Sequence, residues 1–508
     1  MHQYISDFAD YIGEVVTIKG WIANIRKSKT NLFFSFRDGS GFVQCVVSLD
    51  ALGEEAFERA KTLTLESAVA FTGKIASDER QEGGYEVQVS SLEIYHVAEG
   101  FPLAQREKDL GLRYLEDNRH LWLRKKRQWA IMRVRNQLIV GIHEFFQNSG
   151  FIQMDAPLLT GSACEGTTDL FKTEFFDQPA FLSQSGQLYA EAMAMAQGRV
   201  YTFGPTFRAE KSDTPRHLAE FWMIEPEMAF YTNEDNMNLI ERFVKHVIAR
   251  VLDHCKTEFK VLKRDLHQLQ VVRHTTFPRV TYTEAVEILT GRQEVNGRNA
   301  IAIQEHDLAE AKKRIAACKR EIAEREKAIK MGLKKGARKF NEAKIIALRS
   351  EMEAMEQKVR NIPQWIESAR SFQLGRDFGG SDETLLTRVF DAPVMVYNWP
   401  AQIKSFYMKQ VDGNPELVKG VDLLAPEGFG EVIGGSERET NLELLIRKIK
   451  EHNLNQEELE WYLDLRRYGS VPHSGFGLGL ERLVRWVCNL KHVRETIPLA
   501  RRYGRIMP

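Results

Sequence analysis

Three stretches in the second half of the chain combine charged side chains with aromatic residues or glycines in ways that suit a nucleotide. The first runs from Phe207-Arg208-Ala209-Glu210 through a polar loop to His217 and Phe221. We expect a strand, a loop and a second strand that together cover the ligand. An arginine can bind a phosphate through two donors, and an aromatic ring can stack on a base. Because short strings of this kind are common, the pattern has value only together with the other two stretches.

The second stretch, Glu431-Val432-Ile433-Gly434-Gly435-Ser436-Glu437-Arg438, places two glycines among charged side chains. Paired glycines let a ligand approach the backbone. Glu431 and the upstream Asp422 could hold Mg²⁺ between carboxylates and phosphate oxygens. Taken by itself, the string fits a tight turn with surface charges equally well.

The third stretch, Gly475-Phe476-Gly477-Leu478-Gly479-Leu480-Glu481-Arg482, leads from alternating glycines into a helix with Arg482 in its first turns. Its spacing is not that of the dinucleotide-binding GxGxxG motif, and it lacks a Walker lysine. We therefore exclude a Rossmann or P-loop site. The small residues would leave a groove for a flat adenine, with Arg482 above it.

The elements that precede these stretches predict a small barrel. Phe33, Phe34 and Phe36 cannot all point the same way because side chains alternate along a strand, so one set fills the barrel and the other faces out. Three strands, a helix and two further strands within about a hundred residues are typical of a Greek-key barrel of the OB type. The expected strands are 15–22, 32–36, 42–47, 67–75 and 85–95, with the helix at 51–63.

The whole chain predicts an α+β protein with an inserted helical hairpin. We expect an OB-fold domain at 1–105, a charged hinge at 106–127 and a second domain at 128–508 that opens with a long amphipathic helix, 128–148. Within 291–370, apolar residues recur at heptad spacing in two arms around a glycine-containing turn, which predicts an antiparallel coiled coil. The heptad positions of its first arm are Leu308, Ile315, Ile322 and Ile329.

The 508 residues carry 70 Lys and Arg against 70 Asp and Glu, so the formal net charge is +0. This balance excludes a polybasic protein held to nucleic acid by bulk charge. The charge is nevertheless unevenly distributed along the chain. Residues 1–105 are acidic, with nine basic and fifteen acidic side chains. Three zones are basic: 106–140 with ten against four, 312–339 with twelve against three, and 482–508 with seven against one. Such runs are solvated faces or contacts to a polyanion.

The cysteines and the N-terminus indicate the compartment. The five cysteines form no CxxC pair, which favours reduced, metal-free thiols in the cytoplasm. The first residues lack the basic and apolar segments of a signal peptide, and no apolar run is long enough to span a bilayer. We therefore expect a cytoplasmic protein without membrane contact.

Together, the three stretches resemble the motifs of class II aminoacyl-tRNA synthetases. The helix 128–148 and the following extended segment up to Pro157 resemble the first motif of that family, which forms the dimer interface. The second and third motifs resemble residues 207–225 and 475–486, and the N-terminal barrel resembles the subgroup that activates Asp, Asn or Lys. The resemblance implies a class II catalytic domain with an antiparallel sheet flanked by helices, ATP and Mg²⁺ as ligands, tRNA as partner, and a homodimer.

Within this subgroup, segments 181–191, 202–210 and 216–225 resemble the asparaginyl branch. Ala190 stands where the aspartyl enzymes place a lysine, which fits a neutral carboxamide rather than a carboxylate. The resemblance thus implies L-asparagine and tRNA(Asn) as substrates. Three alternatives stay open: an aspartyl enzyme of relaxed tRNA choice, a non-catalytic RNA-binding relative, and an asparagine synthetase of related fold, which would leave the barrel unexplained.

The same resemblance implies the roles of individual residues. Arg208, Glu431 and Arg482 would be catalytic, and ATP would be bound by Arg208, Glu210, His217, Phe221, Glu431, Ser436 and Arg482. The amino acid would be bound by Glu165, Ser185, Gln187, Glu225 and Arg438, and the metal by Asp422, Glu431 and Ser436. In the barrel, the anticodon would be bound by Arg26, Phe33 and Gln44. The hairpin is not part of the usual family sequence, so its basic tip either touches tRNA or binds nothing.

Overall fold

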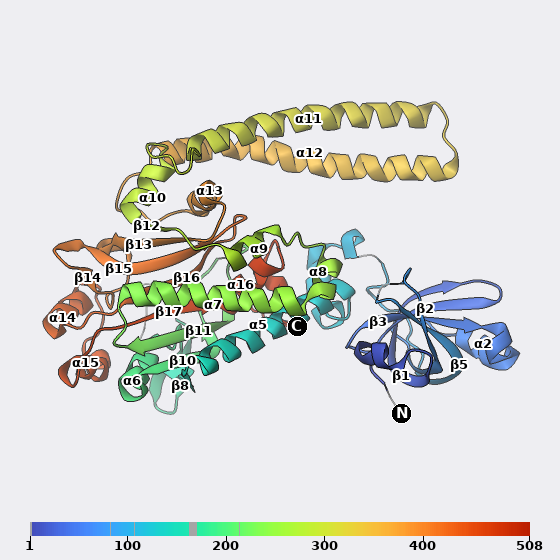
Figure 1. The fold of residues 1–508 in the computed structure, drawn as a ribbon, viewed down its shortest axis with the longest axis horizontal. Coiled ribbons are helices and arrows are strands. Elements are labelled where there is room, and N and C mark those ends of the chain that lie inside the picture. The colour runs from blue at the N-terminus through green and yellow to red at the C-terminus, as the bar shows by residue number, and fades with distance from the viewer. Residues whose placement is uncertain (1–2, 82, 106, 162–169, 213) are drawn as a thin grey trace. The chain divides into compact units, whose positions relative to one another are not determined.

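The computed structural model describes residues 3–81, 83–105, 107–161, 170–212 and 214–508. The chain forms two compact units, drawn in Figure 1. The first contains Met1–Arg133, Thr257–Lys263 and Ile506–Pro508. The second contains Val134–Lys256 and Arg264–Arg505. The predicted hinge, 106–127, lies in the first unit with the barrel.

The first unit is built on a closed five-stranded barrel, which confirms the predicted OB-type fold. The strand order is β1-β2-β3-β5-β4. Phe34 and Phe36 are fully buried and contact the ring of Phe71, each with a centroid separation of 5.6 Å, whereas Phe33 is half-buried on the outside. The strands are β1 (Val15–Lys27), β2 (Asn31–Arg37), β3 (Phe42–Ser48), β4 (Ala68–Ser77) and β5 (Tyr85–His96).

The helix predicted at 51–63 is present but is not continuous. The structure has two helices, α1 (Leu49–Leu52) and α2 (Glu54–Lys61), separated by Gly53. Gly53 has φ +79°, a left-handed conformation that ends one helix and is strained for residues with a Cβ. Phe57 and Ala60 of α2 pack into the barrel core.

The segment after the barrel contains short helices rather than open chain. Leu103, Leu115 and Trp122 form a small apolar cluster within it. The helices are α3 (Leu112–Asp117) and α4 (Arg119–Trp122), followed by the long α5 (Lys126–Asn148), which the amphipathic pattern predicted.

The second unit is built around a nine-stranded sheet with the path β12-β13-β15-β16-β17-β11-β10-β6, to which β14 is added beside β15. The pairs are antiparallel except β6 with β10 and β12 with β13. The strands are β6 (Ile152–Met154), β10 (Arg199–Phe207), β11 (Glu220–Ala229), β12 (Arg279–Thr281), β13 (Val394–Pro400), β14 (Gln410–Val411), β15 (Asn414–Ala425), β16 (Gly430–Glu437) and β17 (His473–Gly479).

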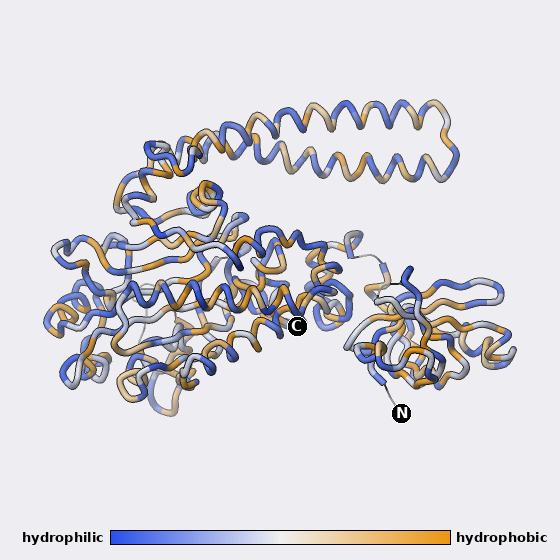
Figure 2. The backbone as a smooth tube through the Cα atoms, viewed as in Figure 1, coloured by the Kyte–Doolittle hydropathy of each residue, from blue (hydrophilic) through white to orange (hydrophobic). Residues whose placement is uncertain are grey.

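Helices flank this sheet, as the α+β prediction requires. Figure 2 shows apolar segments gathered along the strands and the inner sides of the helices. The helices of this unit are α6 (Gln187–Gln197), α7 (Asn233–His254), α9 (His267–His274), α10 (Tyr282–Leu289), α13 (Gly380–Phe390), α14 (Leu442–Glu451), α15 (Glu460–Arg467) and α16 (Leu480–Val487). Helix α8 (Lys256–Leu262), which follows α7 in the chain, belongs to the first unit from Thr257 onward. A separate small sheet has the strand order β7-β9-β8, and its strands come between β6 and α6 in the chain. They are β7 (Leu159–Thr160), β8 (Lys172–Phe175) and β9 (Gln178–Leu182).

The inserted hairpin consists of α11 (Ala300–Lys330) and α12 (Lys335–Arg370), which lie side by side in Figure 1. Its outer half has a core of its own, formed by Cys318, Ile322, Ile345 and Leu348. At its base, Ile301, Ile362 and Ile366 belong instead to the large core that includes α10 and α13. The hairpin therefore has two separately packed halves.

Among the helices of the described residues, none is both long and apolar enough to cross a membrane. Cys45, Cys255, Cys318 and Cys488 are buried and form no disulfide within the same part of the chain, and Cys164 lies outside it.

Candidate active site

A cavity of about 290 Å³ opens on the face of the sheet where β10, β11, β16 and β17 meet the start of α16. It brings together residues from all three sequence stretches. Of the residues predicted for ATP, the amino acid and the metal, the cavity is lined by Ser185, Gln187, Arg208, Glu210, His217, Phe221, Glu225, Asp422, Glu431, Arg438 and Arg482. The predicted ligand Glu165 lies outside the described residues.

Arg208 and Phe221 face each other across the first stretch. β10 ends at Phe207 and β11 begins at Glu220, and these two residues pair in an antiparallel register. The loop between the strands therefore starts with Arg208, whose N–H donates to the Ala219 carbonyl over 3.0 Å. The guanidinium of Arg208 lies 5.4 Å from the centre of the Phe221 ring. A flat aromatic ligand above Phe221 would thus have a phosphate-binding group at its edge.

The loop after Arg208 is ordered by polar contacts. Nδ1 of His217 lies 2.7 Å from the Thr214 hydroxyl and 3.0 Å from the Ser212 hydroxyl, and its Nε2 lies 3.9 Å from Glu210. Burial, aided by three neighbouring arginines, lowers the pKa of His217. The ring is accordingly a neutral hydrogen-bonding group at the cavity wall near pH 7.

Arg482 also lines the cavity and lies in the first turn of α16. Its Nη1 lies 3.3 Å from both the carbonyl oxygen and the carboxylate of Glu431. Burial opposes ionisation of Glu431, but the charges of Arg482, Lys404 and Arg208 outweigh it and lower the pKa of this carboxyl. Glu431 is therefore an ionised group among three cations.

Asp422 and Glu431 converge on Gly434. A Cβ added to Gly434 would lie 3.0 Å from Glu431 Oε1 and 3.6 Å from Asp422 Oδ1. Lys404 donates to the other oxygen of Asp422 over 2.6 Å. Burial and the charge of Glu431 raise the pKa of Asp422 to about 7, against the opposing effect of Lys404. The glycine thus leaves a small space between two carboxylates.

The structure does not bring Ser436 to this carboxylate pair. Its side chain is fully buried, and its Oγ accepts a hydrogen bond from Nη1 of Arg438 over 2.8 Å. Ser436 therefore positions Arg438 rather than facing the space at Gly434.

Glu225 forms the floor of the part of the cavity nearest to α6. Its carboxylate accepts hydrogen bonds from the hydroxyls of Ser185 and Thr202 and from the Gly186 N–H, the last over 2.7 Å. Donors of this kind stabilise the charged form of a carboxylate. Glu225 therefore offers a fixed hydrogen-bond acceptor to whatever enters the cavity.

Arg438 also lines the cavity; it is fully buried and donates to Glu227 through Nε over 3.3 Å and through Nη2. The ring of Tyr407 lies 5.2 Å from the guanidinium. Although burial opposes its charge, Glu227 and Glu191 raise the pKa of Arg438. Burial and Glu191 raise the pKa of Glu227 to about 8, against the opposing effect of Arg438.

Behind Arg438 lies a buried network centred on Glu191. Burial opposes ionisation of Glu191, but Arg466 and His473 outweigh it, so its pKa lies below the usual range. The network fixes α6, and with it Gln187, relative to β17. Glu191 accepts hydrogen bonds from Gln187, Tyr462, Arg466 and His473 over 2.8–3.2 Å.

Sequence reasoning missed Lys404, Tyr407 and Arg216, which also line the cavity. Arg216 donates to Glu383 over 2.6 Å. Lys404 and Tyr407 belong to a segment without a recognisable motif, so only the fold reveals them. Arg216 precedes His217 directly, and that adjacency was a usable signal.

On the barrel, the three predicted residues lie together on the outer face. The guanidinium of Arg26 lies 5.3 Å from the centre of the Phe33 ring, and its Nη2 donates to Gln44 Oε1 over 3.0 Å. The cross-strand registers Arg26–Phe33 and Ser35–Gln44 produce this cluster. A cation, an aromatic face and an amide on a barrel surface suit an unpaired base.

Comparison with known proteins identifies the family. Residues 112–502 match the model of the class II tRNA synthetases for D, K and N, and residues 16–95 match the OB-fold nucleic acid binding domain. The chain belongs to the class II tRNA synthetases.

Among relatives of this synthetase, the asparagine–tRNA ligase of Symbiobacterium thermophilum is 44% identical over 499 residues, which cover 98% of each chain. The asparaginyl-tRNA synthetase of Pyrococcus horikoshii, solved with asparaginyl-adenylate, is 36% identical with a TM-score of 0.79, covering 98% of this chain and 97% of that one. The Entamoeba histolytica asparaginyl-tRNA synthetase is 27% identical with a TM-score of 0.78, covering 100% and 99%.

Proposed function

We propose that this synthetase activates L-asparagine with ATP and transfers it to the 3′ end of tRNA(Asn). The observation that carries the proposal is that Arg438 and Glu225 line one cavity together with the ATP-site residues. The high identity to an asparagine–tRNA ligase over nearly the full length supports the same substrate.

In the first step, the asparagine carboxylate attacks the α-phosphorus of ATP, and pyrophosphate leaves. No protein nucleophile is needed, because the substrate supplies it. We assign Arg208 to the α-phosphate and Phe221 and Arg482 to the two faces of the adenine, with Glu210 and His217 completing the ATP contacts. Catalysis then consists of positioning and charge stabilisation. In the second step, a ribose hydroxyl of the tRNA terminus loses its proton and attacks the carbonyl carbon of the adenylate, so that the ester forms, the acyl–phosphate bond breaks and AMP leaves.

The side chain of asparagine is distinguished from that of aspartate by charge. Arg438 would donate to the carboxamide oxygen, and Glu225 would accept from its NH₂. A carboxylate facing Glu225 would be repelled unless it were protonated. Ala190 on α6 is fully buried in an apolar cluster with Ala194 and Val200 and offers no cation to compensate. Gln187, together with Glu165, is assigned to the substrate ammonium.

We also propose that Mg²⁺ binds with ATP at Asp422 and Glu431. The space at Gly434 fits this ion, because Mg²⁺ takes one or two carboxylates and completes its shell with phosphate oxygens and water. When bound, Mg²⁺ would neutralise phosphate charge. Ser436 is left out of this set because its hydroxyl faces Arg438.

Gly434→Ala is expected to raise the Mg²⁺ concentration required for half-maximal ATP–pyrophosphate exchange about tenfold. The added Cβ would lie 3.0 Å from Glu431 Oε1 and fill the space between the carboxylates. Gly336→Ala is the matched control, because a Cβ there meets no atom within 4 Å. An unchanged Mg²⁺ requirement in Gly434→Ala would contradict the metal site.

Phe33→Ala is expected to raise the KM for tRNA about tenfold, since stacking on one base contributes about 1–3 kcal/mol. Asparagine-dependent pyrophosphate exchange, which needs no tRNA, should keep its rate. Leu92→Ala, which removes a partly buried side chain of the same barrel, controls for general loosening of the fold. Equal KM values for Phe33→Ala and the unmodified protein would remove Phe33 from the tRNA contacts.

We further propose that the protein is a homodimer that pairs through α5 and the segment after it. Exposed apolar side chains in this region support the proposal: Val140, Ile152 and Leu158 have exposed fractions of 38%, 44% and 45%. A dimer would cover them, as the family resemblance of this segment implies.

The decisive experiment is ATP–pyrophosphate exchange with asparagine and with aspartate, side by side. The expected result is exchange with asparagine and little with aspartate. Exchange with aspartate alone, or with neither amino acid, would overturn the proposed function.

A further inference from the structure

We propose that the outer half of the α11–α12 hairpin, residues 312–349, is a second RNA-binding site that contacts the phosphate backbone of the tRNA being charged. The proposal rests on the proposed function, because it takes the enzyme's own tRNA as the partner. It adds a contact outside both the barrel and the ATP cavity.

Basic and acidic residues are separated along the hairpin. The outer half carries fourteen Lys and Arg residues against four Glu residues. The base, residues 300–311 and 350–370, carries three Lys and Arg against seven Asp and Glu. A solvated coiled-coil surface with no partner alternates its charges and pairs them along the helix. This separation of basic from acidic residues instead creates a local positive field that attracts a polyanion.

The cations of the hairpin also differ in pairing. Several arginines are neutralised: Arg314 pairs with Glu351 over 2.7 Å, and Arg349 with Glu326 over 2.8 Å. By contrast, six lysines around the tip are exposed and form no ion pair within the described part of the chain: Lys327, Lys330, Lys334, Lys335, Lys339 and Lys344. These ammonium groups are available to phosphates.

Exposed apolar side chains lie among these lysines. Phe340 and Met331 have exposed fractions of 60% and 77% although an apolar seam is available between the arms. An aromatic face surrounded by cations is the combination that binds unpaired bases next to a sugar-phosphate chain. The tip therefore suits RNA, which has bases as well as phosphates, better than a polyanion that has no bases.

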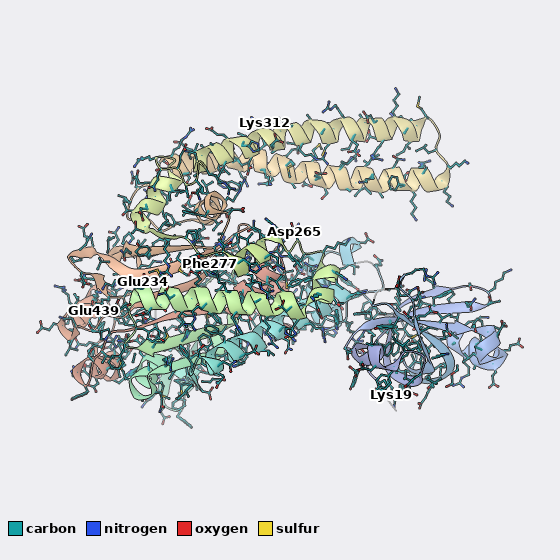
Figure 3. The ribbon with its side chains drawn as sticks, in the orientation of Figure 1. Lys19, Glu234, Asp265, Phe277, Lys312 and Glu439 are labelled. Atoms are coloured by element: carbon teal, nitrogen blue, oxygen red, sulfur yellow. The ribbon has the colours of Figure 1, made fainter. Side chains whose placement is uncertain are left out.

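The hairpin is built to hold this tip away from the ATP cavity. At about 1.5 Å per residue, the 31 residues of α11 extend for about 46 Å. The base is fixed to α13 because Arg388 donates to Asp307 over 2.9 Å, and the two arms are joined where Arg370 donates to Glu305 over 2.8 Å. Figure 3 shows Lys312 on α11 and the side chains of both arms extending outward. A projecting hairpin of this length would contact a part of the tRNA remote from its acceptor end.

An anionic membrane surface fits less well. A helix that lies on a membrane collects its charges on one face and its apolar residues on the other. Here the seam residues Ile322 and Ile345 face the partner arm. Lys335 and Lys344 are nine residues apart, which at 100° per residue places them on opposite sides of α12. Charges that surround the tip suit the curved backbone of RNA.

The test uses the full-length enzyme with Lys330, Lys334, Lys335 and Lys339 all replaced by glutamine. These side chains are exposed and lie outside the seam, so the hairpin should stay folded, which circular dichroism can verify. The matched control replaces the same four lysines by arginine and keeps the charge. Deletion of the whole hairpin is unsuitable, because Ile301 and Ile366 belong to the core of the catalytic unit.

We expect the glutamine variant to raise the tRNA KM about tenfold near physiological salt and to flatten the salt dependence of tRNA binding by about 0.7–0.9 per lost phosphate contact. The arginine variant should behave like the unmodified enzyme, and asparagine-dependent pyrophosphate exchange should be unchanged in both. An unchanged tRNA KM and salt slope would overturn the inference. Lysine-dependent binding to phosphatidylglycerol vesicles without an effect on tRNA would overturn it in favour of a membrane. Failure of exchange in the unmodified protein would count against the proposed function instead.

Discussion

Arg438→Lys is expected to lower kcat/KM for asparagine in pyrophosphate exchange about a hundred- to a thousandfold, while ATP binding remains measurable. Lysine keeps a positive charge near Glu227 but lacks the planar fork that Arg438 uses toward Glu227 and Ser436. Without that fork, no donor is held at the position of the carboxamide oxygen. The measurement is exchange at varied asparagine concentration, combined with ATP titration by fluorescence or calorimetry.

The lysine variant is preferable to Arg438→Ala. Removing the charge altogether would leave Glu191 and Glu227 in a fully buried site without their shared cation. Breaking a buried pair in this way costs about 3–5 kcal/mol, so loss of activity could reflect unfolding. Arg447→Lys on the exposed face of α14 is the control for an arginine-to-lysine change. Wild-type kcat/KM for asparagine in Arg438→Lys would contradict the assignment of Arg438 to the substrate.

Arg208→Ala should lower kcat for adenylate formation about a hundred- to a thousandfold, because it removes a preorganised phosphate donor from the cavity. The effect should appear in pyrophosphate exchange and in single-turnover adenylate formation. Arg208 directly follows β10 and lies over Phe221, so the alanine variant should not disturb the sheet.

Arg199→Ala provides a matched control for this change. Arg199 begins the same strand at its other end and is exposed. Comparable exchange rates in Arg199→Ala and the unmodified protein are expected. A kcat in Arg208→Ala within a fewfold of that of the control would remove Arg208 from the catalytic step.

The sequence predicted those parts of the molecule in which local pattern decides structure. Strand alternation predicted that one set of the phenylalanines at 33, 34 and 36 fills the barrel and the other faces out, and the structure has Phe34 inside and Phe33 outside. The heptads predicted the hairpin. The helix predicted at 51–63 is divided in two because Gly53 takes a left-handed conformation, which the helical pattern alone does not reveal.

The residues of the candidate site that belong to a sequence motif could be predicted. Those that meet only through the packing of distant elements could not. Glu191 and Arg466 lie 275 positions apart in the chain and meet only because α6 and α15 pack together. The placement of Ser436 shows a second limit. A register shift in the β15–β16 pair changes which residues of β16 accompany Glu431, and a bulge of this kind leaves no mark in the sequence. Gly434 pairs with Asp422 across the two strands, whereas Ser436 pairs with Gly420, so Gly434 rather than Ser436 lies beside the two carboxylates.

The separate packing of the two hairpin halves has a consequence for local unfolding. The outer half is stabilised by the small cluster of Cys318, Ile322, Ile345 and Leu348, which shares no residue with the large core at the base. Its amide hydrogens should therefore exchange through a local opening that leaves the base protected, in two kinetic classes along each arm. Because that opening does not reach the catalytic core, the outer half can be lengthened, shortened or labelled by whole heptads as an independent module.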